Sequence, residues 1–144
     1  MEKSNTIIVY CDGGSRGNPG PAALGIVISS EKEEKGYSHY LGESTNNDAE
    51  YQAIIFALKK IKHLFGNEKA GKMIVEIKSD SELAINQLNG TNKIKEKNLQ
   101  ELFVMVWNLK QDFKEVNFSH IPREENKKAD KLVNQELDSQ KGMF

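Results

Sequence analysis

The run Thr6-Ile7-Ile8-Val9-Tyr10-Cys11-Asp12 is apolar and largely β-branched up to its last residue. A short run of this composition is typical of a central β-strand that is covered on both faces. Its last residue carries a carboxylate, which is costly to place in an apolar core unless a cation or hydrogen-bond donors compensate it. The run therefore predicts a strand at the centre of a sheet, with an acidic side chain at its carboxyl end.

The rest of the chain divides into turns, short strands and amphipathic helices. The pattern predicts strands over 6–12, 22–30 and 37–41, a helix that begins within 44–48 and carries apolar residues to Leu64, a strand over 72–79, helices over 81–88 and 99–113, a strand over 116–119 and a helix over 126–138. Right-handed crossovers lay the later strands parallel to the first. This order favours an α/β fold with a mixed sheet that has a hairpin at one side.

Length and composition match one globular domain. The chain has 144 residues, of which 38% are hydrophobic and 28% charged, so we expect a single domain over 1–144 with flexible ends at 1–5 and 139–144. The 20 Lys and Arg residues face 21 Asp and Glu residues, which gives a formal net charge of -1. Because no global basic field exists, a polyanionic partner would have to be bound by local contacts.

Cysteine usage and the N-terminal residues indicate a compartment. The single Cys11 excludes a disulfide framework and a thiolate zinc site, since each of these needs several cysteines. The first apolar run is too short for a signal-peptide core or a membrane span. We therefore expect a cytoplasmic protein with no membrane partner.

Four carboxylates stand at positions where core side chains are expected. Asp12 and Asp80 close two strands that would be parallel neighbours, so both side chains would emerge at one sheet edge. Glu50 and Asp130 each lie on the apolar face of a predicted helix and would point at the sheet. Four converging carboxylates repel one another unless a cation joins them, and an all-oxygen set favours magnesium or manganese over zinc.

Each acid also has a simpler interpretation when it is taken alone. Asp12 before Gly13 suits a turn, Asp80 before Ser81 suits a helix cap, and the two helical acids could face solvent. For these interpretations to hold together, four unrelated acids would all have to lie at one edge of the sheet by chance. The simpler interpretation is therefore weak for the four acids jointly. A glycine-rich segment also follows Asp12, but its spacing is not that of a dinucleotide-binding loop; it is better explained as a tight loop that lets a polymer approach.

These residues resemble the ribonuclease H family, type 1. The matching pieces occur in family order and are Tyr10-Cys11-Asp12-Gly13-Gly14-Ser15-Arg16-Gly17-Asn18-Pro19-Gly20, Thr45-Asn46-Asn47-Asp48-Ala49-Glu50, Ser79-Asp80-Ser81 and Asn126-Lys127-Lys128-Ala129-Asp130. The resemblance implies a ribonuclease H-like fold, with a five-stranded sheet in the order 3-2-1-4-5 and helices on both faces. It also implies an endonuclease that hydrolyses the RNA strand of RNA–DNA hybrids and leaves 5′-phosphate and 3′-hydroxyl ends.

The resemblance further implies a role for each matching residue. Two Mg²⁺ ions, with Mn²⁺ as a substitute, would be held by Asp12, Glu50, Asp80 and Asp130, and Glu50 would also reach the RNA 2′-hydroxyl, which distinguishes RNA from DNA. The positions that match contacts to the hybrid are Gly13, Gly14, Arg16, Asn18, Asn46, Asn47 and Glu82. No small-molecule cofactor is implied, and we expect a monomer.

Three departures from the family pattern qualify these expectations. Residues 89–97 lead almost directly into the next helix without the basic protrusion of many members, as in the compact, archaeal-like subgroup. Weak hybrid affinity follows, with Lys93, Lys95 and Lys97 as candidate phosphate contacts. Arg123 is expected to replace the mobile loop histidine of relatives and to help product leave, while His120 belongs to a strand end. Glu82 stands where relatives often have glutamine, which puts a negative charge near phosphates.

Two other functions remain open from the sequence. A catalytically weak nucleic-acid-binding module is favoured by the missing protrusion and the neutral net charge. A related nuclease that acts on double-stranded RNA, or on a DNA end, is also compatible, because fold and metals alone do not fix the substrate. The helix over 99–113 is expected to be a core helix, with a dimerisation face as the alternative.

Overall fold

The computed structural model describes residues 5–141, and residues 1–4 and 142–144 lie outside the described part. The elements in chain order are β1 (Thr6–Ser15), β2 (Gly20–Ser29), β3 (Glu34–Ser44), α1 (Asn46–Phe65), α2 (Asn67–Ala70), β4 (Ile74–Ser79), α3 (Glu82–Leu88), α4 (Lys97–Lys110), β5 (Glu115–His120), a short 3-10 helix (Arg123–Glu125) and α5 (Lys127–Lys141). None of the described helices is long and apolar enough to cross a membrane.

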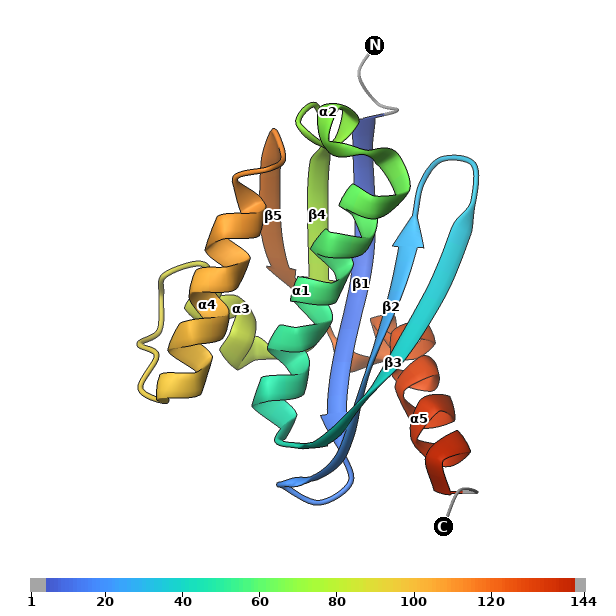
Figure 1. Cartoon of the computed structure of the whole chain (residues 1–144), viewed down its shortest axis with the longest axis vertical. Coiled ribbons are helices and arrows are strands. Elements are labelled where there is room, and N and C mark those ends of the chain that lie inside the picture. Colours follow the sequence, from blue (N-terminus) through green and yellow to red (C-terminus); the bar gives the residue numbers. More distant parts are fainter. Residues whose placement is uncertain (1–4, 142–144) are drawn as a thin grey trace.

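The five strands form one mixed sheet in the order β3-β2-β1-β4-β5 (Figure 1). β1 pairs antiparallel with β2, and β2 pairs antiparallel with β3. On its other side β1 pairs parallel with β4, which in turn pairs parallel with β5. The predicted sheet order is confirmed, and the carboxyl ends of β1 and β4 lie next to each other.

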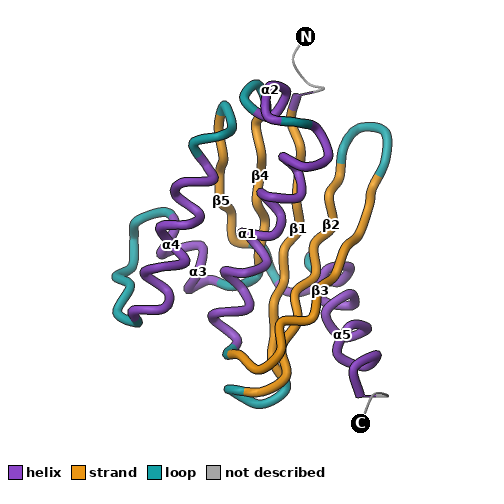
Figure 2. Tube along the Cα trace, viewed as in Figure 1, coloured by secondary structure: helices purple, strands orange, loops and turns teal. Residues whose placement is uncertain are grey.

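Helices cover both faces of the sheet (Figure 2). In β2, alternate side chains point to opposite faces and pack against different helices. Leu24, Ile26 and Ile28 face the main core, to which α1, α3 and α4 contribute. Ala23, one residue out of phase, packs with Val133 and Leu137 of α5 on the opposite face. Strand β2 is therefore buried on both sides, which explains its nearly continuous apolar sequence.

Helix α4 is a core helix, because Leu99, Leu102 and Val106 are buried in the main core. Its outer face carries exposed side chains at Val104 and Trp107, each 53% exposed.

Several element boundaries differ from those predicted. β1 continues past Asp12 to Ser15, since Gly13, Gly14 and Ser15 pair with residues of β2. Asp12 therefore lies inside β1, one residue after Cys11, which is the last residue of β1 that pairs with β4. The hairpin strand β3 is longer than predicted because it pairs with β2 over nearly all of that strand's length. Helix α5 runs to Lys141, so residues 139–141, expected as part of a flexible end, are helical. The short helix α2 was not predicted.

Candidate active site

Asp12 and Asp80 lie side by side where the parallel pairing of β1 and β4 ends. Cys11 is the register partner of Ser79, so the next residue on each strand is an aspartate. Asp12 is 7% exposed, and Asp80 is partly buried. Asp12, Glu50 and Asp80 each offer a carboxylate oxygen, and these oxygens all lie within 4.8 Å of one another.

Helix α1 brings Glu50 to this edge. The helix begins after Thr45, whose side chain accepts a hydrogen bond of 3.2 Å from the backbone N–H of Asp48. Glu50 Oε1 accepts a hydrogen bond of 2.9 Å from the backbone N–H of Gly13. A β-carbon on Gly13 would collide with the carbonyl of Ala49, so only glycine lets β1 and α1 approach this closely.

Helix α5 adds Asp130 from the other face of the sheet. A β-carbon on Gly25 of β2 would lie 2.6 Å from the carbonyl oxygen of Ala129, which shows how closely α5 packs on the strand. Asp130 lines the same pocket as the other three acids, and this pocket has a volume of about 370 Å³. Its lining also includes Gly13, Gly14, Ser15, Arg16, Asn46, Arg123, Val133, Asn134 and Leu137.

Burial and the charges of neighbouring acids raise the proton affinity of Asp12 and Glu50. Burial, together with the negative charges of Asp80 and Asp130 and a side-chain hydrogen bond with Asp130, raises the pKa of Asp12 to about 8. Burial and the charges of Asp12 and Asp80 raise the pKa of Glu50 well above its usual range, and the Gly13 N–H partly opposes that rise. The pocket therefore concentrates negative charge that a cation would relieve.

The donor set fits hard divalent cations. Oxygen ligands are preferred by Mg²⁺, Mn²⁺ and Ca²⁺, whereas zinc sites commonly contain His or Cys. Three carboxylate oxygens within 4.8 Å, in a pocket with a fourth acid, are close enough to share one or more such ions. Asp12, Glu50 and Asp80 are therefore the candidate ligands nearest one another, and Asp130 is the candidate that extends the site.

Comparisons with known proteins show similarity over most of the chain. A family model described as "Reverse transcriptase-like" matches residues 10–136. The ribonuclease HI of Halobacterium salinarum is 36% identical over 141 residues, which cover 95% of this chain and 67% of that protein. Its crystal structure superposes with a TM-score of 0.81 at 37% identity, covering 93% of this chain and 98% of that one.

The chain belongs to the ribonuclease H family. LC11-RNase H1, a type 1 member isolated from compost, has been solved in complex with an RNA/DNA hybrid; it is 45% identical, with a TM-score of 0.84, covering 90% of this chain and 94% of that one. A bifunctional protein of Mycobacterium tuberculosis is 35% identical over 136 residues, which cover 92% of this chain. The chain spans only 36% of the length of that mycobacterial relative.

The ribonuclease H fold is compact here between α3 and α4. Among the described residues, only the loop of residues 89–96 stands where a protrusion would be inserted. The loop backbone is anchored by two hydrogen bonds. Gln87 Nε2 donates one of 3.1 Å to the Lys93 carbonyl, and Gln100 Nε2 donates one of 2.8 Å to the Ile94 carbonyl. Tyr51 holds Gln87 in turn through a buried hydrogen bond of 2.7 Å. Lys93 and Lys95 are exposed on this anchored loop, and Lys97 is exposed at the start of α4.

The predicted substrate-contacting residues fall into two groups. Gly13, Gly14, Arg16 and Asn46 line the pocket, whereas Asn18, Asn47 and Glu82 are not among its described lining residues. Asn18 Oδ1 accepts a hydrogen bond of 3.0 Å from the Asn46 backbone N–H, and Asn46 Oδ1 accepts one of 2.9 Å from the Ser15 backbone N–H. These two amides thus join the turn after β1 to the start of α1.

Arg16 and Arg123 both line the pocket, and their surroundings differ. Arg16 forms an ion pair of 2.8 Å with Asp138 and weaker hydrogen bonds to Asn134, so α5 holds its guanidinium. Arg123 is exposed, begins the 3-10 helix and lines the pocket with the four acids. His120 is the last residue of β5, as predicted.

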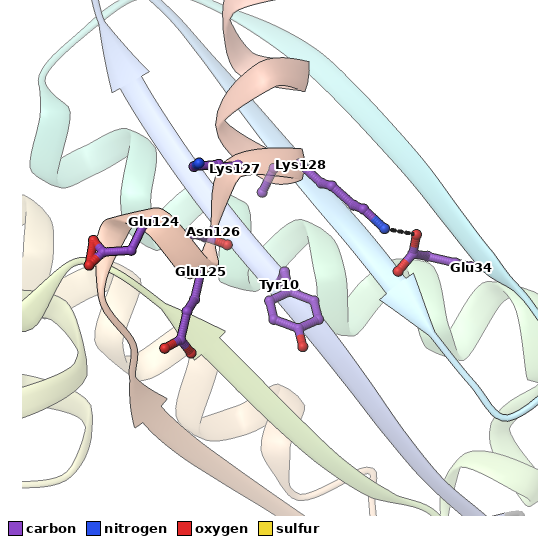
Figure 3. A pocket seen from close by; sticks show the side chains of 8 residues that line it. Tyr10, Glu34, Glu124, Glu125, Asn126, Lys127 and Lys128 are labelled. Atoms are coloured by element: carbon purple, nitrogen blue, oxygen red, sulfur yellow. Dashed lines mark hydrogen bonds and ion pairs between the residues drawn. The ribbon is translucent and has the colours of Figure 1, made fainter.

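Sequence reasoning assigned no role to Asn126. This residue is 1% exposed and lies directly before α5, and Figure 3 shows it where the chain enters that helix beside β1. It also lines a second pocket of about 260 Å³, together with Tyr10 and the ion pair of 2.6 Å between Lys128 and Glu34. Its place four residues before Asp130 in a matching motif was the only sequence signal for it.

Proposed function

We propose that this chain is a single catalytic domain that hydrolyses the RNA strand of RNA–DNA hybrids and leaves 5′-phosphate and 3′-hydroxyl ends. The observation that carries the proposal is the meeting of three carboxylates within 4.8 Å at the shared edge of β1 and β4, with Asp130 in the same pocket. The hybrid-bound structure of LC11-RNase H1, a similar chain, supports the choice of substrate.

The acids serve as ion holders in this proposal. Asp12, Glu50, Asp80 and Asp130 would hold two Mg²⁺ ions, with Mn²⁺ as a substitute, because all four offer oxygen ligands in one pocket. The chemistry that such ions supply when bound is activation of the attacking water and stabilisation of the leaving oxygen. The protein's own contribution is to fix the carboxylates in place before the substrate arrives.

Other residues of the chain would bind and select the substrate. Gly13 fixes one oxygen of Glu50, and the second oxygen is assigned to the RNA 2′-hydroxyl, which a DNA strand lacks. Arg123 offers a positive charge at the pocket edge, where phosphate oxygens of the substrate and product would lie. Gly14, Arg16, Asn18, Asn46 and Asn47 are assigned to the hybrid backbone and minor groove.

The deciding experiment is cleavage of a hybrid labelled on each strand, in Mg²⁺, in Mn²⁺ and in EDTA. We expect cleavage of the RNA strand alone, loss in EDTA and loss in Asp12→Asn. Asp112→Asn is the matched control, because Asp112 pairs with Lys62 away from the pocket, and it should cleave like the wild type. Mass spectrometry of the products identifies their ends.

The same assay separates the alternatives. Cleavage of double-stranded RNA or of a DNA duplex in preference to the hybrid would reassign the substrate. Hybrid binding by folded protein without cleavage in either metal would favour a nucleic-acid-binding module. We also propose action as a monomer in the cytoplasm, which sedimentation of the purified chain and imaging of a tagged copy would test.

A further inference from the structure

Asn126 connects the chain segments that carry three of the four acids. It lies between the 3-10 helix and α5, and its backbone carbonyl accepts a hydrogen bond of 3.1 Å from the N–H of Asp130. Its side chain is buried beside the end of the β1–β4 pairing (Figure 3). One residue thus contacts the first turn of α5, strand β1 and Asp80, the residue that follows β4.

The side-chain amide spans the two strands. Asn126 Nδ2 donates a hydrogen bond of 2.8 Å to the carbonyl of Cys11, the residue before Asp12, and a second of 3.0 Å to Asp80 Oδ1. A carbonyl and an ionised carboxylate are both acceptors only, so the amide nitrogen must face them. The orientation of the amide is therefore fixed by chemistry.

The opposite end of the amide indicates what this orientation costs. Asn126 Oδ1 is buried and accepts no hydrogen bond from any described residue. A buried acceptor without a partner destabilises the fold, and native proteins contain few of them. Local costs of this kind are expected where a functional site dictates the side chain.

We propose that Asn126 is a positioning residue that sets the relative placement of Asp12, Asp80 and Asp130 for divalent cations. The inference rests on the proposed function, in which these acids hold the ions. By fixing Asp80 Oδ1, the amide gives the second oxygen of that carboxylate one orientation in the pocket. Its hydrogen bonds with the Cys11 carbonyl and the Asp130 N–H connect the backbone beside Asp12 and the first turn of α5 to Asn126. Outer partners of this kind typically change ion affinity or activity by about 10- to 100-fold when they are removed.

The test measures Mn²⁺ and Mg²⁺ binding to the substrate-free protein by calorimetry. In Asn126→Ala we expect affinity to fall by about tenfold or more. With the hybrid at saturating metal, kcat should fall while KM for the hybrid stays within about twofold. Asn89→Ala is the matched control: it removes an amide-to-carbonyl bond of 3.0 Å to Phe118, away from the acids, and should keep wild-type ion affinity and kcat.

A second variant separates positioning from folding. Asn126→Ser keeps a residue that begins helices well, but its single hydroxyl donor cannot supply both bonds, so it should fold and still lose ion affinity. Wild-type ion affinity and kcat in either folded variant would overturn the role of Asn126. A wild-type protein that neither binds ions nor cleaves the hybrid would instead overturn the proposed function.

Discussion

The backbone N–H of Gly13 donates a hydrogen bond of 2.9 Å to Oε1 of Glu50. Gly13 directly follows Asp12, so the backbone beside one candidate ligand holds the carboxylate of another. This bond crosses from β1 to α1 and depends on the missing side chain of Gly13. The close packing of β1 against α1 at Gly13 therefore also positions the Glu50 carboxylate.

Gly13→Ala should damage both stability and activity. The new β-carbon would collide with the Ala49 carbonyl, so α1 must move and the hydrogen bond to Glu50 is weakened. We expect the free energy of unfolding to fall by about 1–3 kcal/mol and kcat to fall at least about tenfold. Urea unfolding and hybrid cleavage measure the two effects. Gly14→Ala is the stability control, because its β-carbon would meet its nearest atom at 3.7 Å; equal stability of the two variants would contradict the packing argument.

The metal-free protein should lose stability as the pH rises. The native pKa of Asp12, about 8, lies above its usual value near 4, and that of Glu50 is raised too. The stabilising contribution is therefore complete below about pH 4 and is lost as the pH rises through about 8. Each proton that only the native state retains lowers the free energy of unfolding by about 1.4 kcal/mol per pH unit.

Urea unfolding in EDTA between pH 5 and pH 8 measures this slope. Asp12→Asn should flatten it and should be more stable than the wild type at pH 8, because it removes a charge that burial disfavours. At pH 8, adding Mg²⁺ should stabilise the wild type more than the variant, which lacks one of the candidate ligands. A wild-type slope as flat as that of the variant would show that burial and the neighbouring charges do not raise the pKa of Asp12.

The sequence predicted most of the sheet but not every contact at its active edge. The run ending at Asp12 and the strand ending at Ser79 were enough to bring Asp12 and Asp80 together, because parallel neighbours share an edge. The extension of β1 to Ser15 depends on pairing with β2 across a turn, which strand composition does not reveal. The bond from Asn126 to Cys11 joins residues 115 positions apart, so only the folded chain displays it.

Neutralising the anchored loop should weaken hybrid binding in a salt-dependent way. Lys93, Lys95 and Lys97 are exposed on a backbone that Gln87 and Gln100 hold in place. If they contact phosphates, each Lys→Gln change should lower the slope of log affinity against log salt by about one. Fluorescence anisotropy of a labelled hybrid in EDTA measures the slope. Lys72→Gln, an exposed lysine at the opposite edge of the sheet, is the control, and equal slopes would remove the loop from the substrate surface.

Arg123→Ala should slow turnover with little effect on binding. Arg123 lines the acidic pocket, and none of the described residues forms an ion pair with it. In the proposed function, its positive charge helps the cleaved product to leave. We expect the steady-state rate to fall at least about tenfold, equivalent to about 1.4 kcal/mol in the barrier, with hybrid affinity within about twofold. Arg123→Lys keeps the charge and should recover part of the rate. A steady-state rate equal to the wild type in Arg123→Ala would exclude this role, and Lys127→Ala is the neighbouring control.

Glu82→Gln should tighten hybrid binding while slightly lowering stability. Glu82 is exposed in the first turn of α3, two residues after Asp80, so in the proposed function its charge would repel substrate phosphates close to the acids. The same charge interacts favourably with the helix N-terminus, which is worth about 0.3–1 kcal/mol. The two effects therefore have opposite signs and separate in two measurements, hybrid affinity in EDTA and urea unfolding. Glu68→Gln removes an exposed first-turn acid from α2, away from the pocket, and should lower stability without changing affinity. Equal or weaker hybrid binding by Glu82→Gln would show that the carboxylate at this position does not oppose the substrate.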